Sequence, residues 1–256
     1  MTGATTDGVA TAPPSGTGAA VSASGITRTF GTGDAAVEAL RGVDVSFPRG
    51  QFAAVMGPSG SGKSTLMHLL AGLDAPTAGS VQIYGREITT MGDAELTRLR
   101  RDRIGFVFQF FNLLPMLSAE QNVELPLRLA GRSAEDGWVE QLLASVGLGD
   151  RRRHKPSELS GGQQQRVAVA RALVNKPAVV FADEPTGNLD SKTSAEILEL
   201  MRQSTADFGQ TIVIVTHDAR AAAIADRVVF LSDGLIVADR GRMSADEILD
   251  QIKSLE

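Results

Sequence analysis

The most informative absence in this sequence is cysteine, which does not occur among its 256 residues. Without cysteine, the chain can form neither disulfide bonds nor thiolate metal sites. Any bound metal ion must therefore be held by oxygen atoms or by one of the three histidines. A chain of this length is long enough for one large α/β domain, or two small ones, with a substantial apolar core.

Positive charge is also in short supply. Lysine and arginine number 25 against 30 aspartates and glutamates, which gives a formal net charge of −5 at pH 7. Proteins that bind nucleic acids by neutralising phosphates normally present a basic face. The dense basic run at 151–155 is interpreted as a solvated loop. We therefore expect no nucleic-acid partner.

Long apolar runs are missing as well. No run approaches the roughly 18 to 20 residues that cross a bilayer, and the N-terminus has no basic region followed by an apolar stretch. We therefore expect a cytoplasmic chain that neither spans a membrane nor is secreted. Any role at a membrane would have to come through a partner.

A change of composition divides the chain into a tail and a domain. Residues 1–24 are mostly Gly, Ala, Ser, Thr and Pro, with too few large apolar side chains to offset the entropy of ordering, so we predict a disordered low-complexity tail. Residues 25–256 are expected to form one domain, with a helical subdomain inserted at about 110–160. A helix in that insertion is expected to open at Ser133, with Asp136 as its capping partner.

The order of the predicted elements indicates the fold class. Alternating segments after residue 25 predict an antiparallel β-layer. Short apolar strands then alternate with helical patterns, as in a mostly parallel sheet that helices cover on both faces. A last hairpin is predicted to turn at Asp233 and Gly234. The apolar strands are expected at 52–56, 104–109, 178–182 and 211–215.

The segment 57–64 (GPSGSGKS) matches the phosphate-binding pattern G-x-x-x-x-G-K-[ST], with an apolar strand before it and an apolar helix after it. Its glycines let backbone N–H groups point inward, and the helix N-terminus adds positive potential. Lys63 is placed to reach the β- and γ-phosphate oxygens, and the Ser64 hydroxyl can ligate Mg²⁺. The expected nucleotide-binding residues are Gly57, Pro58, Ser59, Gly60, Ser61, Gly62, Lys63, Ser64 and Thr65, the last at the α-phosphate.

Two carboxylates, Asp183 and Glu184, follow the apolar strand 178–182. They come at the strand end where open α/β sheets bind ligands. Two carboxylates beside a triphosphate would repel it unless a cation intervenes. We therefore expect Asp183 to bind Mg²⁺ together with Ser64, and Glu184 to polarise the attacking water.

Three further side chains are candidates for the same site. His217 follows the strand 211–215 and is expected to hydrogen-bond the γ-phosphate, although a histidine there can also be satisfied by a neighbour. Gln109 ends the strand before the helical insertion, and its amide is expected to contact Mg²⁺ or the attacking water. Phe30 offers an aromatic face on which adenine can stack, with core packing as the alternative.

A second glycine-rich helix start occurs at 159–166 (LSGGQQQR). It offers a hydroxyl and free backbone N–H groups to an anion, but it lacks the lysine and the Mg²⁺-binding hydroxyl of the first loop. Because the helical insertion separates the two loops, we expect them to meet only between two copies related by a two-fold axis, with two ATP molecules between them. The residues expected to contact ATP from this side are Ser160, Gly161, Gly162 and Gln163.

Taken in order, these motifs resemble the nucleotide-binding subunit of ATP-binding cassette transporters, over about residues 24–240. The resemblance implies an α/β fold with a P-loop NTPase (RecA-like) core, an N-terminal antiparallel β-layer and an inserted α-helical subdomain. It implies a Mg-dependent ATPase that pairs with itself or a related ATPase on binding ATP. It also places Asp190, in the segment 187–191 (GNLDS), at the dimer seam. The family's tyrosine is replaced here by Phe30, and Phe110 stands where a small polar residue is common.

The same resemblance implies a membrane partner. Segments 111–131 and 187–191 are most similar to the lipoprotein-release and macrolide-export group, which implies an integral membrane permease, an export or lipid-extracting role, and a location at the inner face of the cell membrane. A short permease helix would enter a groove beside Gln109. Packing inside the subdomain is the alternative for the residues that would line that groove, Leu113, Leu114, Met116 and Leu117.

Two other functions are left open by the sequence. A cassette ATPase that clamps DNA or a ribosome would be expected to carry a coiled-coil insertion, a second cassette or a basic surface, none of which this sequence has. A membrane complex that relays signals or activates cell-wall hydrolases would leave the same motifs as a transporter.

Overall fold

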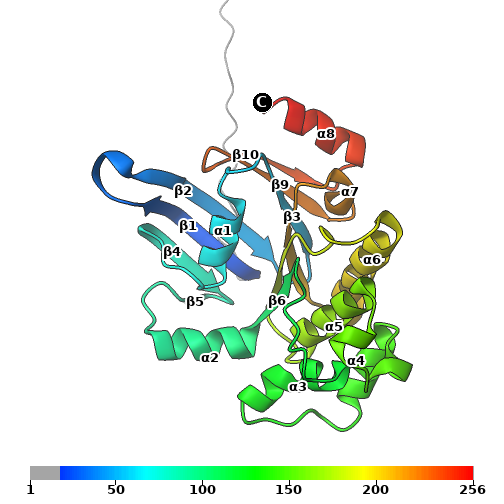
Figure 1. Cartoon of the computed structure of the whole chain (residues 1–256). Helices are drawn as coiled ribbons and strands as arrows, with labels where there is room; N and C mark the ends of the chain where they lie inside the picture. Colours follow the sequence, from blue (N-terminus) through cyan, green and yellow to red (C-terminus); the bar gives the residue numbers. More distant parts are fainter. Residues whose placement is uncertain (1–17, 256) are drawn as a thin grey trace, which may run out of the picture.

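The computed structural model describes residues 18–255, which form two β-sheets flanked by helices (Figure 1). The first sheet is antiparallel, with the strand order β2-β1-β4-β5. It is the antiparallel β-layer that the sequence predicts. Its strands are β1 (Ala19–Phe30), β2 (Val37–Pro48), β4 (Ala78–Ile83) and β5 (Arg86–Glu87).

Strand β1 starts earlier than the composition of the sequence predicts. The disorder predicted for residues 19–24 is wrong, because these residues pair with β2 on one side and with β4 on the other. Val21 and Ala23 are buried there. Their small side chains belong to the core that also contains Val55 and Leu66, which lie well after β1 in the chain, and local composition does not reveal this packing. The remainder of the predicted tail, residues 1–17, lies outside the described residues.

The second sheet has the order β10-β9-β3-β8-β7-β6 and is parallel except for β10, which forms a hairpin with β9. Asp233 and Gly234 both have positive φ, 48° and 75°, as the predicted tight turn requires. The strands are β3 (Phe52–Met56), β6 (Ile104–Phe108), β7 (Val179–Asp183), β8 (Thr211–Val215), β9 (Arg227–Ser232) and β10 (Leu235–Gly241).

The strands of the parallel sheet are apolar throughout because they face two separate cores. Successive side chains of a strand point to opposite faces. In β3, Phe52, Ala54 and Met56 belong to one core, and Ala53 and Val55 belong to the other. The first core is completed by the helical part of the molecule, and the second by the antiparallel sheet and the helix that follows β3.

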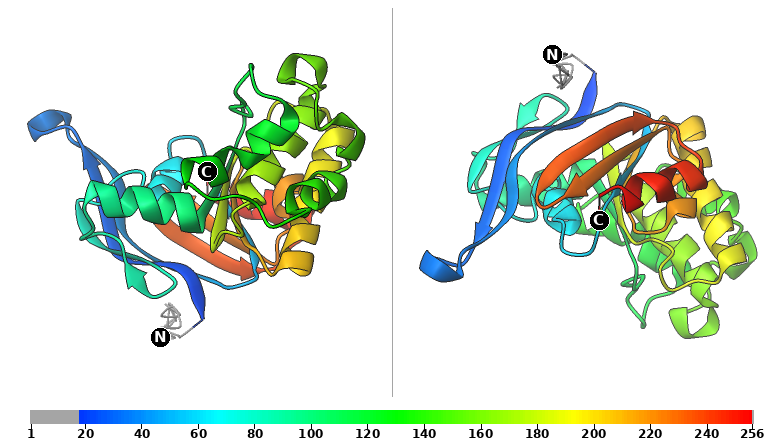
Figure 2. Two further views of the ribbon diagram at one scale, coloured as in Figure 1. Left: turned by 90° about the horizontal axis from the view of Figure 1, so that it is seen from below. Right: turned by 90° about the horizontal axis from the view of Figure 1, so that it is seen from above.

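The four helices between residues 119 and 208 gather on one side of the molecule, opposite the antiparallel sheet, while the C-terminal helix lies beside the β9–β10 hairpin (Figure 2). Among residues 18–255 no helix is long and apolar enough to cross a membrane. The helices are α1 (Lys63–Leu70), α2 (Asp93–Arg103), α3 (Ala119–Leu129), α4 (Trp138–Ser145), α5 (Gly161–Leu173), α6 (Ser191–Phe208), α7 (Ala219–Ala222) and α8 (Ala245–Lys253), with short 3-10 turns at Gly33–Ala35, Gly149–Arg151 and Pro156–Glu158.

Helix α4 corrects another expectation. It opens at Trp138 and not at Ser133, and Gly137 stands at its N-cap with φ 76°. The Trp138 indole donates a hydrogen bond to the Val174 carbonyl (2.9 Å) and packs edge-on against Phe208. These contacts to α5 and α6 set where the helix begins, and they outweigh the local capping pattern.

Candidate functional site

The loop at 57–62 joins β3 to α1 and needs glycine at two positions. Gly57 has φ 152°, and a Cβ there would collide with the Leu231 carbonyl. Gly62 has φ 100°, and a Cβ there would press against the Ala39 carbonyl. The loop therefore curls close to neighbouring backbone and directly precedes the N-terminus of α1, where free N–H groups favour an anion.

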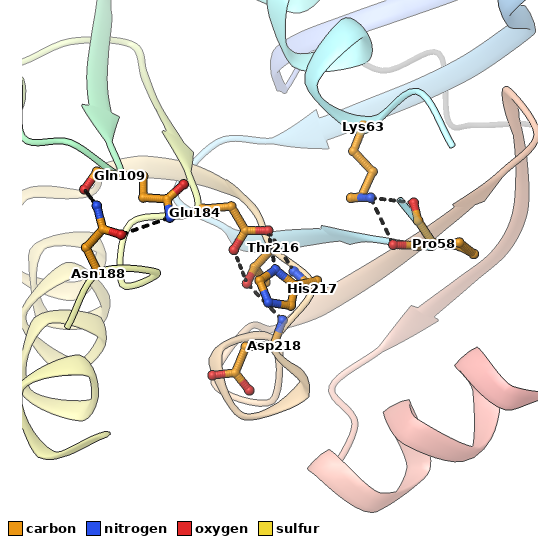
Figure 3. A network of polar contacts seen from close by, with 9 residues as sticks. Pro58, Lys63, Gln109, Glu184, Asn188, Thr216, His217 and Asp218 are labelled. Atoms are coloured by element: carbon orange, nitrogen blue, oxygen red, sulfur yellow. Dashed lines mark hydrogen bonds and ion pairs between the residues drawn. The ribbon is translucent and has the colours of Figure 1, made fainter. Parts of the chain in front are cut away.

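The Lys63 side chain is hydrogen-bonded to the backbone of the same loop. Its Nζ donates hydrogen bonds to the carbonyls of Gly57 (2.9 Å) and Pro58 (2.7 Å), as Figure 3 shows. Burial lowers the pKa of Lys63, while the nearby charges of Glu184 and Asp183 act in the opposite direction. The loop therefore presents one ammonium group and a set of backbone donors beside two carboxylates, which suits a phosphate chain accompanied by a cation.

Asp183 and Glu184 lie at the carboxyl edge of the parallel sheet. Asp183 ends β7 and is in register with Phe108 of β6 and Val215 of β8. Burial raises the pKa of Asp183, and the neighbouring charge of Glu184 raises it further. A cation at this edge would relieve both effects, because it offsets the desolvation and the repulsion between the two carboxylates.

The Glu184 side chain is held by the two residues that directly follow the adjoining strand β8. Thr216 donates its hydroxyl to Oε2 (3.1 Å), and His217 places its backbone N–H 3.0 Å and its ring Nδ1 2.7 Å from Oε1 (Figure 3). The backbone of Glu184 has φ 44°, which is uncommon for a residue other than glycine, and its N–H donates to the Val215 carbonyl. Strain of this kind is concentrated at functional sites.

The Gln109 side chain is hydrogen-bonded to Asn188, a residue whose role the sequence motifs do not predict. Its Nε2 donates to Asn188 Oδ1 (3.1 Å), and Asn188 Nδ2 donates to the Gln109 carbonyl (3.1 Å). Gly187 lies directly against the same amide, since a Cβ there would stand 2.7 Å from Gln109 Nε2. The segment 187–191 could be recognised in the sequence as a motif, but its contact with Gln109 depends on the pairing of β6 with β7.

The other candidates have distinct positions. Phe30 ends β1 with 43% of its surface exposed, so the alternative of core packing is wrong, and the Arg28 guanidinium lies 4.7 Å from its ring centre. Asp190 caps α6 by accepting from the N–H groups of Lys192 and Thr193 and from the Thr193 hydroxyl (2.6 Å). The Thr193 hydroxyl holds the pKa of Asp190 below its usual range.

The second glycine-rich segment caps α5. Ser160 Oγ accepts from the Gln163 N–H (3.3 Å), while Gln163 Oε1 accepts from the Ser160 N–H (2.9 Å). A Cβ at Gly162 would collide with the Thr193 methyl group, so α6 requires glycine there. At Gly161 a Cβ would make only ordinary contacts, at 3.6 and 3.7 Å. Nothing that surrounds Gly161 within residues 18–255 therefore explains its lack of a side chain.

A metal ion would need ligands beyond the protein carboxylates. Among residues 18–255 no group of three or more His, Asp or Glu side chains is placed to hold a metal. Ser64, Gln109 and Asp183 offer a hydroxyl, an amide and a carboxylate oxygen, which are the donors that Mg²⁺ prefers. Mg²⁺ usually completes its shell with water and substrate phosphates, so this donor set fits a cation that arrives with a nucleotide.

Comparison with known proteins gives consistent matches. The family described as "ABC transporter" matches residues 40–187. The Macrolide export ATP-binding/permease protein MacB of Marinobacter nauticus is 50% identical over 218 residues, which is 84% of this chain and 34% of MacB. An uncharacterized ABC transporter ATP-binding protein of Thermotoga maritima is 51% identical over 213 residues, 82% of this chain and 91% of that protein. The chain spans about a third of the length of its MacB relatives.

Solved structures confirm the predicted fold. The dimeric structure of a post-hydrolysis state of the ATP-binding cassette MJ0796 bound to ADP and Pi has a TM-score of 0.78 and 43% identity, covering 88% of this chain and 99% of that one. The structure of cbiO1 from Clostridium perfringens, part of the transporter complex cbiONQ, has a TM-score of 0.78 at 26% identity, covering 91% and 92% of the two chains. Both share the antiparallel sheet and the mostly parallel sheet with its helices.

Proposed function

Because this chain belongs to the ABC transporter family and is an ATPase subunit related to MacB and MJ0796, we propose that it works as a pair. Two copies would close on two ATP molecules, and this closure would drive a membrane permease. Each ATP would lie between the loop 57–65 of one copy and the segment 160–163 of the other. In support, the MJ0796 relative is dimeric in its structure with ADP and Pi.

The observation that carries this proposal is Gly161 at the start of α5, where nothing in the described part of its own chain requires glycine. Its own chain leaves room for a Cβ there, in ordinary contact with Leu189 and Phe111. No hydrogen bond among the described residues joins the segment 159–163 to the loop 57–64. A second copy would bring a phosphate group to this helix start, where backbone N–H groups and the helix dipole favour an anion. A glycine is then needed so that the nucleotide can approach the backbone.

The residues at the sheet edge would carry the chemistry. Ser64, Asp183 and Gln109 would hold Mg²⁺, which when bound neutralises charge on the phosphates. Glu184 would accept a proton from the attacking water, since Thr216 and His217 orient its carboxylate. Lys63 would place its positive charge on the terminal phosphates, and His217 would contact the γ-phosphate from the opposite side.

Phe30 is proposed to stack on adenine. We expect Phe30→Ala to raise the KM for ATP about fivefold, because loss of an aromatic stacking contact costs about 1 kcal/mol. Phe30→Tyr should leave KM unchanged. Steady-state ATPase assays measure both, and Val37→Ala is the matched control, since Val37 is the exposed cross-strand neighbour of Phe30. An unchanged KM in Phe30→Ala would show that adenine lies elsewhere.

The permease is proposed to dock beside the segment 110–117 and to hold the chain at the inner face of the membrane. Leu114 and Met116 are 43% and 76% exposed, and Phe110 is 74% exposed, which leaves apolar surface for a partner. Leu113 instead packs against the core, as the packing alternative expects. By analogy with MacB, whose name joins an ATP-binding part to a permease, we propose a permease of the export type.

We expect the double variant Leu114→Ser, Met116→Ser to bind the permease much more weakly than the wild-type chain. Affinity purification from detergent-solubilised membranes should recover the membrane protein with the wild-type chain and at least about tenfold less with the variant, because central apolar anchors dominate interface energy. Val237→Ser on β10, which also removes an exposed apolar side chain, is the matched control. Equal recovery by the double variant would place the docking surface on another part of the chain.

A further inference from the structure

Gln165 is a fully buried polar side chain inside α5, five residues after Ser160. Its Nε2 donates a hydrogen bond to the Pro185 carbonyl (2.5 Å) and makes a longer contact to the Phe108 carbonyl (3.4 Å). Pro185 directly follows Glu184, and Phe108 directly precedes Gln109. One amide group therefore touches the backbone beside both side chains that are proposed to act on water and Mg²⁺.

The orientation of this amide is determined by its surroundings. Both neighbours are carbonyl oxygens, which only accept hydrogen bonds, so the NH₂ group of Gln165 must face them. The other atom, Oε1, is buried and has no hydrogen-bond partner within residues 18–255. An unpaired buried oxygen is unfavourable, and a side chain kept only for stability would not be expected to leave one. The Gln165 amide therefore donates to the two carbonyls, while its own oxygen is left without a hydrogen bond among the described residues.

Arg171, also on α5, contacts the same segment of chain three to four residues further on. Its guanidinium donates to the carbonyls of Phe111 (2.7 Å) and Asn112 (2.5 Å). Both residues have positive φ, 55° and 50°, so this backbone is in an uncommon conformation. Helix α5 therefore contacts the backbone immediately before Gln109 and again two to three residues after it. A shift of α5 would move the segment 108–112 with it.

We infer that Gln165 is a positioning residue of the ATPase reaction, which ties Glu184 and Gln109 to the helix that begins at the second glycine-rich segment. The inference rests on the proposed function, because it takes Glu184 as the base and Ser160 to Gln163 as the contact to the partner copy's nucleotide. When two copies close, the nucleotide of the partner would fix the position of α5. Through its two carbonyl contacts, Gln165 would then fix the backbone beside Gln109 and Glu184 in the same chain. The effect is mechanical and requires no contact between Gln165 and the nucleotide.

The test is Gln165→Met, which keeps the volume and removes the amide. We expect kcat to fall on the order of tenfold or more, since small displacements of catalytic groups have effects of that size. The KM for ATP should stay within about threefold, because the phosphate loop is untouched. The matched control is Gln210→Met, which alters another buried glutamine whose Oε1 has no hydrogen-bond partner among the described residues. Gln165→Asn, whose amide is one methylene shorter, should lose kcat in the same way if the methionine variant does not fold.

Assays should run well below the midpoint of thermal unfolding of every variant. Circular dichroism gives the folded fraction of each variant, and kcat is calculated per folded molecule. A kcat equal to wild type in Gln165→Met, or a loss matched by Gln210→Met, would overturn the inference. Glu184→Gln serves as the reference in the same assay. If it turns over ATP normally, the proposed role of Glu184 fails; if it is inactive while Gln165→Met is fully active, only the inference about Gln165 fails.

Discussion

Glu184→Gln is expected to bind ATP, to accumulate as an ATP-bound dimer and to turn over on the order of 10²–10³ times more slowly than the wild type. Glutamine keeps the shape of the side chain: its single amide oxygen can accept from the His217 backbone N–H, and its NH₂ group can donate to the Thr216 hydroxyl, which in the wild type donates to the carboxylate. It cannot take a proton from water at neutral pH. Without hydrolysis, the phosphate that joins the two copies remains in place.

The measurement combines steady-state ATPase rates with light scattering in the presence of ATP and Mg²⁺. The matched control is Glu135→Gln, which changes an exposed glutamate whose ion pair within residues 18–255 is with Lys176, and exposed pairs of this kind contribute little. Undiminished turnover in Glu184→Gln would remove Glu184 from the chemistry. A variant that is inactive but stays monomeric with bound ATP would instead contradict the two-copy arrangement.

The sheet edge could be anticipated because parallel strands bring their carboxyl ends together. Phe108, Asp183 and Val215 are neighbours in register, so the residues that follow them must lie close to one another. This is why Gln109, Glu184 and His217 could be placed in one site from their positions after apolar runs. The phosphate loop could be predicted for another reason, because its conformation depends on glycines within one short motif. In the structure, Gly57 and Gly62 of this motif lie against neighbouring backbone carbonyls.

Other features could not be obtained from the sequence because their causes are distant in the chain. The early residues of β1 are ordered by β2 and β4, and α4 begins where Trp138 meets α5 and α6. Gln165 is one of three consecutive glutamines, and only the fold distinguishes it by bringing Pro185 and Phe108 to its amide. Periodicity gives the face of a helix, but it does not identify which carbonyl lies opposite.

Mixing two inactive variants is expected to restore activity, because each proposed site takes one loop from each copy. Lys63→Met removes the cation of the first loop. Gly161→Asp places a carboxylate at the start of α5, where its Cβ has room in the chain and the helix dipole favours a negative charge, so folding should be unharmed. The same carboxylate would repel a phosphate brought by a second copy. Each variant alone should therefore be almost inactive.

In an equal mixture, half of the pairs join one copy of each variant, and such a pair has one intact site and one doubly defective site. If the two sites work independently, the mixture should reach about a quarter of the wild-type rate, since random pairing of equal partners gives half of the pairs as mixed ones. The control mixes Lys63→Met with Gly162→Asp, whose side chain would collide with Thr193 in its own chain and should lower the unfolding temperature. A rate no greater than the sum of the separate variants would mean that the two loops serve the same copy, and the glycine at position 161 would then need another explanation.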